Sequence, residues 1–102
     1  MSDISSLHSS LVAGVLEGEG RASPETRRAA FDNEGLDEPL SEIVEKVAHH
    51  ARTVTDADIG VLKKAGLSED QIYEIVVCAA IGQATRQLQN ALAALGAATG
   101  RD

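Results

Sequence analysis

The feature that most constrains the fold is the stretch of residues 68–95, SEDQIYEIVVCAAIGQATRQLQNALAAL. Ser68 is a good helix cap, and Gln71, three residues later, has the side chain that completes a capping box. Gly96 follows the last leucine and favours the end of the helix at that point. Because no proline interrupts the stretch, it predicts one long helix or two collinear helices.

Apolar residues occupy two faces of this predicted helix when successive residues are placed about 100° apart. The first face carries Ile72, Ile75, Val76 and Ala79. The nearly opposite face carries Val77, Ile81, Ala84, Leu88, Leu92 and Leu95. A helix that is apolar on two sides is enclosed by protein on both, so we expect residues 72–81 to cross the middle of a core.

Beyond Gly82 the two faces differ in character. The first face becomes polar, with Gln83, Arg86, Gln89 and Asn90. Such a face can pair across a symmetric interface or line a polar pocket, and we favour the interface. The second face stays apolar, with alanines among its leucines, and we expect it to dock closely on another helix from the same chain or from a second copy.

Shorter helical segments precede the long helix. Apolar spacing and capping residues predict helices at about residues 3–16, 24–31, 40–51 and 56–65. Because no segment shows the alternating apolar pattern of a strand, we predict an all-α protein of about five helices. The turn-rich residues 32–39, DNEGLDEP, divide it into an N-terminal helical arm, residues 1–38, and a helical core, residues 39–102, within a single domain.

Charge and composition exclude several classes of function. A net charge of −7 at pH 7 argues against nucleic-acid binding, because phosphate contacts need clustered Lys and Arg. The longest apolar run, residues 75–81, is far shorter than the roughly 20 residues that span a bilayer, so we expect no membrane partner. The N-terminus lacks the pattern of a secretory signal, and a single cysteine fits a reducing cytoplasm. With 2% aromatic residues and no glycine-rich phosphate loop, no cofactor is expected.

Residues 40–95 resemble the carboxymuconolactone decarboxylase and alkylhydroperoxidase D-like family. The most similar part is Ala65-Gly66-Leu67-Ser68, followed by acidic and amide residues and then by Ile72 at the start of a long alanine-rich helix. The resemblance implies a small all-helical unit that assembles into symmetric homo-oligomers. It also implies that any active site lies near the contacts between subunits.

The sequence departs from this family at its catalytic motif. Peroxidase-type members carry a Cys-x-x-Cys-x-x-x-His motif shortly before the turn, and the corresponding positions here are near Ala51, Val54 and Asp58. Residues 1–77 contain no cysteine, so no shift of register restores the motif. Thiol–disulfide exchange needs two thiols, and Cys78, within IVVCAA, has the surroundings of a small buried hydrophobe. We therefore expect no thiol peroxidase activity.

His49 and His50 are adjacent near the end of a predicted helix. Adjacent residues point about 100° apart and do not readily share a metal ion, so no metal site is expected. A histidine near a helix C-terminus also interacts favourably with the helix dipole. The functional alternative is an acid–base pair in a cleft, formed by one histidine with Glu45 or Asp58. Asp58 also lies in the first turn after Thr55, where helix capping explains it.

Three hypotheses follow for the function. The first is a non-catalytic interaction or accessory subunit in the cytoplasm. It forms a homo-oligomer through the long C-terminal helix, and a further protein partner is possible. The second is an acid–base enzyme of lyase or decarboxylase type acting on a small organic acid or lactone, with His49, His50, Glu45 and Asp58 as candidate catalytic residues. The third is a ligand-binding module with a small apolar pocket beside Val77 and Ile81.

Overall fold

The computed structural model describes residues 2–98 and confirms the all-α prediction. Within these residues it has five α-helices, α1 Ser2–Glu17, α2 Pro24–Asp32, α3 Leu40–His49, α4 Asp56–Lys64 and α5 Glu69–Ala98, and a short 3₁₀ helix, Ala51–Thr53. This part of the chain contains no strand. Residues 99–102, which belong to the predicted core, lie outside the described residues.

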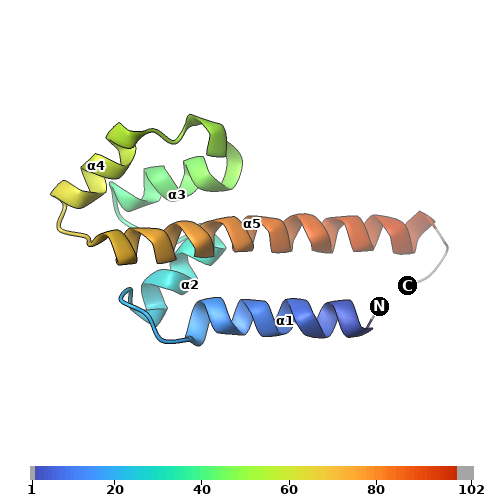
Figure 1. The fold of residues 1–102 in the computed structure, drawn as a ribbon. Coiled ribbons are helices and arrows are strands. Elements are labelled where there is room, and N and C mark those ends of the chain that lie inside the picture. The colour runs from blue at the N-terminus through green and yellow to red at the C-terminus, as the bar shows by residue number, and fades with distance from the viewer. Residues whose placement is uncertain (1, 99–102) are drawn as a thin grey trace.

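The long helix α5 is the rod on which the other helices are arranged (Figure 1). Helices α3 and α4 lie along one side of its N-terminal half, and α1 runs antiparallel to it on the other side. Its C-terminal half extends beyond α3 and α4, with α1 beside it and the end of α2 in contact with its first turn. The molecule is therefore elongated, with extents of 51 × 28 × 21 Å.

The N-terminal half of α5 is enclosed on two sides, but the second side is not the expected one. The first predicted face is buried at Ile72, Ile75 and Ala79. The other buried residues are Cys78 and Gly82, whereas Val77 and Ile81 are only half-buried. The reason is residue size, because Cys78 and Gly82 leave room for α1 and α2 to approach α5 closely.

Helix α2 makes the closest contact with α5. A Cβ atom added at Gly82 would overlap the backbone carbonyl of Phe31 at the end of α2. One turn further on, Arg86 Nη1 donates a hydrogen bond of 2.8 Å to the same carbonyl oxygen. Arg86 also contacts Gln83 Oε1 at 3.1–3.3 Å. The Arg86 side chain, expected at an interface between copies, thus serves a contact within the chain.

The predicted helix caps are present. Ser68 Oγ accepts a hydrogen bond from the Gln71 amide at 3.1 Å, and Gln71 Oε1 accepts one from the Ser68 amide at 2.9 Å. Thr55 and Asp58 form the same reciprocal box at the start of α4, whereas Ser23 Oγ at the start of α2 accepts a hydrogen bond from the Thr26 amide. At its other end α5 continues through Gly96 to Ala98, so the predicted stop was wrong. A glycine within a helix costs only about 1 kcal/mol of helix stability relative to alanine, and the high helix propensity of the neighbouring alanines favours continuation of the helix.

The largest cluster of buried side chains includes Leu16, Ala30 and Phe31 together with Val44 and Ile75. It therefore draws residues from both sides of the proposed boundary at residue 38. The division into an arm and a core stays a prediction.

Candidate interaction surface

One face of α5 remains apolar and exposed along most of the helix. We call it the open face, and it consists of Tyr73, Val77, Ala80, Ile81, Ala84, Leu88, Ala91, Leu92 and Leu95. Tyr73 is 71% exposed, Leu92 39% and Leu95 56%. The other members are half-buried or exposed. It contains the second apolar face predicted from the sequence, and the residues that the structure describes leave much of it exposed.

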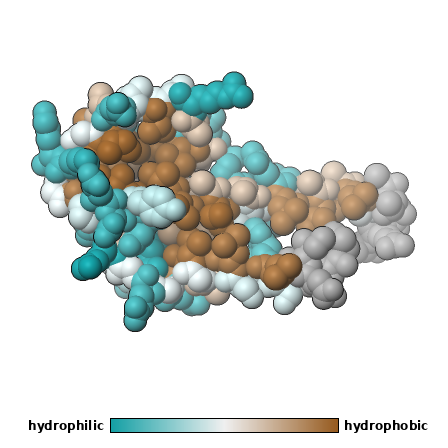
Figure 2. All heavy atoms as spheres, viewed as in Figure 1, coloured by the Kyte–Doolittle hydropathy of each residue, from teal (hydrophilic) through white to brown (hydrophobic). Residues whose placement is uncertain are grey.

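Helix α1 adds further exposed apolar side chains to the elongated end of the molecule. Leu7 is 72% exposed and Leu11 50%. They are one helical turn apart, and Val15, one turn later, is half-buried. Figure 2 shows apolar side chains gathered over both α1 and α5 on the same side of the molecule. Large apolar patches on a soluble protein commonly mark interaction sites.

The charge distribution along α5 gives a signal that the sequence reasoning missed. The chain has 16 acidic residues, yet none lies in residues 75–98. Arg86 is the only charged residue in this range, and its guanidinium is directed to Phe31. A second copy of this acidic chain can therefore approach the open face with little repulsion at the contact itself.

The position of α1 beside α5 depends on the buried Arg27 of α2. Arg27 Nη1 donates hydrogen bonds to the carbonyls of Val15, at 3.2 Å, and Gly18, at 2.7 Å. These carbonyls belong to the last turn of α1 and the loop after it, where backbone oxygens lack helical partners. Arg27 Nε is buried and has no hydrogen-bond partner among the described residues. Arg27 thus fixes the end of α1 within the core.

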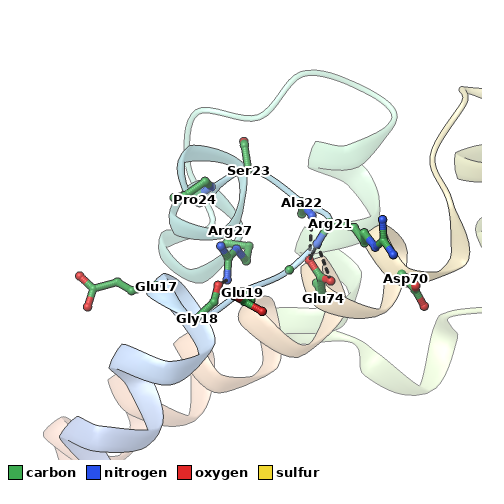
Figure 3. A pocket seen from close by; sticks show the side chains of 11 residues that line it. Glu17, Gly18, Glu19, Arg21, Ala22, Ser23, Pro24, Arg27, Asp70 and Glu74 are labelled. Atoms are coloured by element: carbon green, nitrogen blue, oxygen red, sulfur yellow. Dashed lines mark hydrogen bonds between the residues drawn. The ribbon is translucent and has the colours of Figure 1, made fainter.

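Glu74 of α5 holds the loop that follows α1. Its carboxylate accepts hydrogen bonds from the backbone amides of Arg21, at 2.8–2.9 Å, and Ala22, at 2.7 Å (Figure 3). The Ala22 and Arg21 amides hold the pKa of Glu74 below its ordinary value of 4.5. The adjoining hollow, about 860 Å³ in volume, is bordered by Glu74 and Arg27, which are both engaged in these backbone contacts.

His8 of α1 contacts Thr85 of α5 directly. His8 Nε2 lies 2.9 Å from Thr85 Oγ1, which donates its own proton to the Ile81 carbonyl at 2.7 Å. Because a hydroxyl has one proton, His8 Nε2 must be the donor.

Two of the candidate catalytic residues, Glu45 and His49, lie one turn apart on the surface of α3. His49 Nε2 is 3.7 Å from Glu45 Oε1, and both residues are exposed. The other carboxylate oxygen of Glu45 accepts a 2.6 Å hydrogen bond from Asn33 Nδ2 at the end of α2. Glu45 thus has a structural contact between α2 and α3, and its catalytic role stays a prediction.

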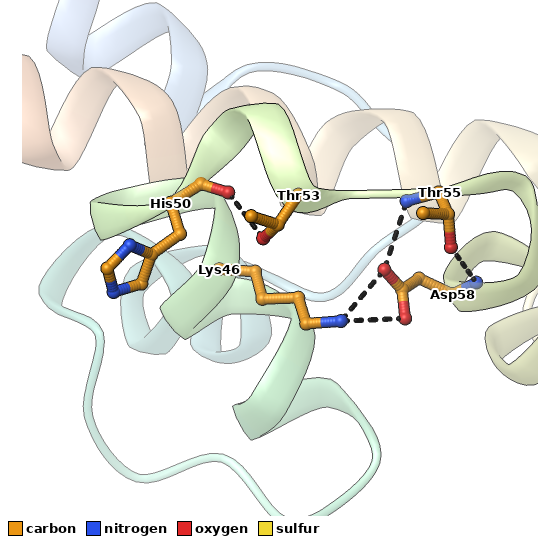
Figure 4. A network of polar contacts seen from close by, with 5 residues as sticks. All are labelled: Lys46, His50, Thr53, Thr55 and Asp58. Carbon is orange, nitrogen blue, oxygen red and sulfur yellow. Dashed lines mark hydrogen bonds and ion pairs between the residues drawn. The ribbon is translucent and has the colours of Figure 1, made fainter.

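Asp58 and His50 lie near each other in sequence but have different contacts (Figure 4). The Asp58 carboxylate accepts hydrogen bonds of 3.0 Å from Lys46 Nζ and from the Thr55 amide. The Thr55 amide, followed by Lys46, lowers the pKa of Asp58. His50 is exposed, and its backbone carbonyl accepts a bond from Thr53. The structure therefore pairs Asp58 with Lys46, a residue that the sequence reasoning did not single out.

Cys78 is buried, and its Sγ lies 3.7 Å from the Val15 carbonyl oxygen. Burial raises the pKa of the Cys78 thiol, which disfavours the nucleophilic thiolate. In the described part of the chain, no group of three or more His, Cys, Asp or Glu side chains is arranged to hold a metal ion. Likewise, none of the helices within residues 2–98 has the length and apolar character to cross a membrane.

A small apolar hollow of about 270 Å³ lies between α4 and α5. Ile59, Ile72, Tyr73 and Val76 line it, and the ion pair between Lys63 and Glu69 borders it. It lies about one turn before the position beside Val77 and Ile81 that the sequence suggested for a pocket. Through Tyr73 it is continuous with the open face.

Comparison of the chain with known protein families, with characterised proteins and with solved structures finds no match.

Proposed function

We propose that this protein is a non-catalytic, homo-oligomeric interaction or accessory subunit of the cytoplasm, and that it assembles through the open face of α5. The observation that carries the proposal is the exposed, acid-free apolar surface in an otherwise acidic chain. The resemblance to the carboxymuconolactone decarboxylase and alkylhydroperoxidase D-like family, whose members form symmetric homo-oligomers, supports the same conclusion.

The free energy available at this surface supports assembly. Full burial of one leucine side chain contributes roughly 1.5–3 kcal/mol. Leu92 and Leu95 on α5 and Leu7 and Leu11 on α1 are each more than one-third exposed. In a two-fold symmetric contact every residue is buried twice, once from each copy, so a few such side chains offset the entropy lost on association.

The contacts of the polar candidates support a structural role for them. Asp58 is bound by Lys46 and caps α4, and Glu45 binds Asn33. Cys78 is enclosed by apolar neighbours. None of these contacts requires a substrate, and each one joins two segments of the fold.

The assembly is tested by the mass of the Leu92→Ser, Leu95→Ser double variant, measured by light scattering during size-exclusion chromatography. We expect the wild type to elute as an oligomer and the double variant as a single chain. Val61→Ser is the control, because Val61 is similarly exposed, at 48%, but lies on α4 away from the open face. A wild type that is monomeric, or a double variant that assembles as well as the wild type, would refute the proposal.

The non-catalytic part of the proposal is tested separately with a peroxide-reduction assay. We expect no turnover above that of Cys78→Ser, because the thiol is buried and has no resolving cysteine in the sequence. Substantial turnover that disappears in Cys78→Ser would show a redox enzyme instead.

A further inference from the structure

We propose that two copies of this chain pair antiparallel through α5, with Ala84 on the two-fold axis. This inference rests on the proposed function and adds the register and symmetry of the assembly. It follows from the spacing, size and charge of the residues on the open face.

The central line of the open face has a palindromic spacing. It contains Tyr73, Val77, Ala80, Ala84, Leu88, Ala91 and Leu95. The successive intervals are 4, 3, 4, 4, 3 and 4 residues, the same in either direction from Ala84. Intervals of three and four keep side chains on one stripe of a helix. Two such stripes running in opposite directions therefore match position by position.

Side-chain size follows the same symmetry. In the antiparallel register Ala84 faces its own copy, Ala80 faces Leu88, and Val77 faces Ala91. Each larger side chain beside the axis thus meets an alanine, which lets the layers interdigitate. A parallel pair in register would instead place Leu88 against Leu88 and Ala80 against Ala80, with alternating crowding and gaps.

The ends of the stripe also match. Tyr73 and Leu95 lie about 33 Å apart along α5, at a rise of 1.5 Å per residue. In the antiparallel register Leu95 of the second copy meets Tyr73 at the edge of the apolar hollow between α4 and α5. This hollow, about 270 Å³ in volume, has room for the leucine side chain. The same contact forms at the other end by symmetry.

Charge and bulk favour the antiparallel arrangement. Glu69, Asp70 and Glu74 lie in the first turns of α5, and of these Glu69 is paired with Lys63, so a parallel pair would still bring the excess negative charge of both copies to one end. The antiparallel pair separates the two acidic groups to opposite ends, where repulsion is screened. It also places α3 and α4 of the two copies at opposite ends, because they cover only the N-terminal half of α5 (Figure 1).

Disulfide trapping distinguishes the two registers. Ala84 and Ala91 are both exposed alanines of α5, and native Cys78 is buried and stays in both variants. In the proposed pair the two copies of residue 84 are adjacent, whereas the two copies of residue 91 are about 21 Å apart along the axis. Mild oxidation should therefore give at least about tenfold more covalent dimer for Ala84→Cys than for Ala91→Cys. An equimolar mixture of Ala80→Cys and Leu88→Cys should give mainly the mixed dimer.

Equal trapping of Ala84→Cys and Ala91→Cys would indicate a parallel pair and overturn the inference. Failure of Ala84→Cys to trap, with a wild type that is oligomeric by light scattering, would also overturn the register but leave the proposed function standing. Failure of both variants with a monomeric wild type would overturn both. Circular dichroism of each variant confirms that the helices are intact.

Discussion

Gly82 of α5 lies directly against the backbone carbonyl of Phe31, the penultimate residue of α2. A side chain at this position would overlap that carbonyl, and Arg86, one turn later, donates a hydrogen bond to the same oxygen. The lack of a side chain at Gly82 thus lets the end of α2 approach α5 closely, and the Arg86 guanidinium holds it there. This contact sets how closely the N-terminal part of the chain approaches the central helix.

Gly82→Ala should lower the free energy of unfolding by about 1–3 kcal/mol, because the added methyl group forces α2 away from α5. The direction of this change is diagnostic, because replacing a glycine by alanine within a helix otherwise stabilises the protein by up to about 1 kcal/mol. Gly60→Ala is the matched control, because nothing lies within 4 Å of its added Cβ. Urea denaturation of the two variants should move the midpoint in opposite directions. A stabilised Gly82→Ala variant would contradict the close packing.

Arg27→Met should lower the free energy of unfolding by about 1–3 kcal/mol, because the Val15 and Gly18 carbonyls lose their charged donor. Hydrogen exchange should also quicken in the last turns of α1. Arg28→Met removes the same charge from the neighbouring residue, whose ion pair with Asp32 is exposed, and should have little effect. If both variants behave alike, Arg27 does not anchor α1.

Glu74 should make stability depend on pH in the acid range. Its pKa in the folded chain is below its ordinary value of 4.5, so the folded state binds the proton less readily than the unfolded state. The contribution of Glu74 is therefore complete above pH 4.5 and is lost as the pH falls through the lowered pKa. Glu74→Gln should be less stable than the wild type at pH 7, and its stability should depend less on pH below about pH 5. Thermal unfolding of both proteins across this pH range checks both expectations. Glu34→Gln, with the same charge change in an exposed loop, should retain the wild-type profile.

Ala84→Glu should break the assembly, because two carboxylates would face each other across the proposed axis at low dielectric. The substitution is mild for the single chain, since Ala84 is exposed and glutamate is a good helix former. Asn90→Glu adds the same charge to an exposed position about 120° around α5 from Ala84 and should leave the assembly intact. Native mass spectrometry measures the number of subunits in both variants. An oligomeric Ala84→Glu protein would exclude Ala84 from the contact.

Local features of the fold were predictable from the sequence. The capping box of Ser68 and Gln71 and the cap of α4 at Thr55 depend on residues three apart, so residue type alone determines them. The long helix and the all-α class were also predictable, from the helical spacing of apolar residues and from the absence of proline in residues 68–95.

The direction from which α1 and α2 approach α5 was not predictable in this way. Large apolar residues at Val77 and Ile81 suggested burial, while the closest contacts form at Cys78 and Gly82. Apolar spacing shows which side chains favour burial but not whether the same chain or another covers them. The pairing of Lys46 with Asp58 was missed because it joins two helices across a loop.

Sedimentation velocity of the wild-type protein, from about 1 µM to about 100 µM, tests most directly whether the open face is covered by a second copy. We predict a species of at least twice the chain mass of 10.7 kDa, which dissociates to the single chain only on dilution. A single species of 10.7 kDa at every concentration would contradict it.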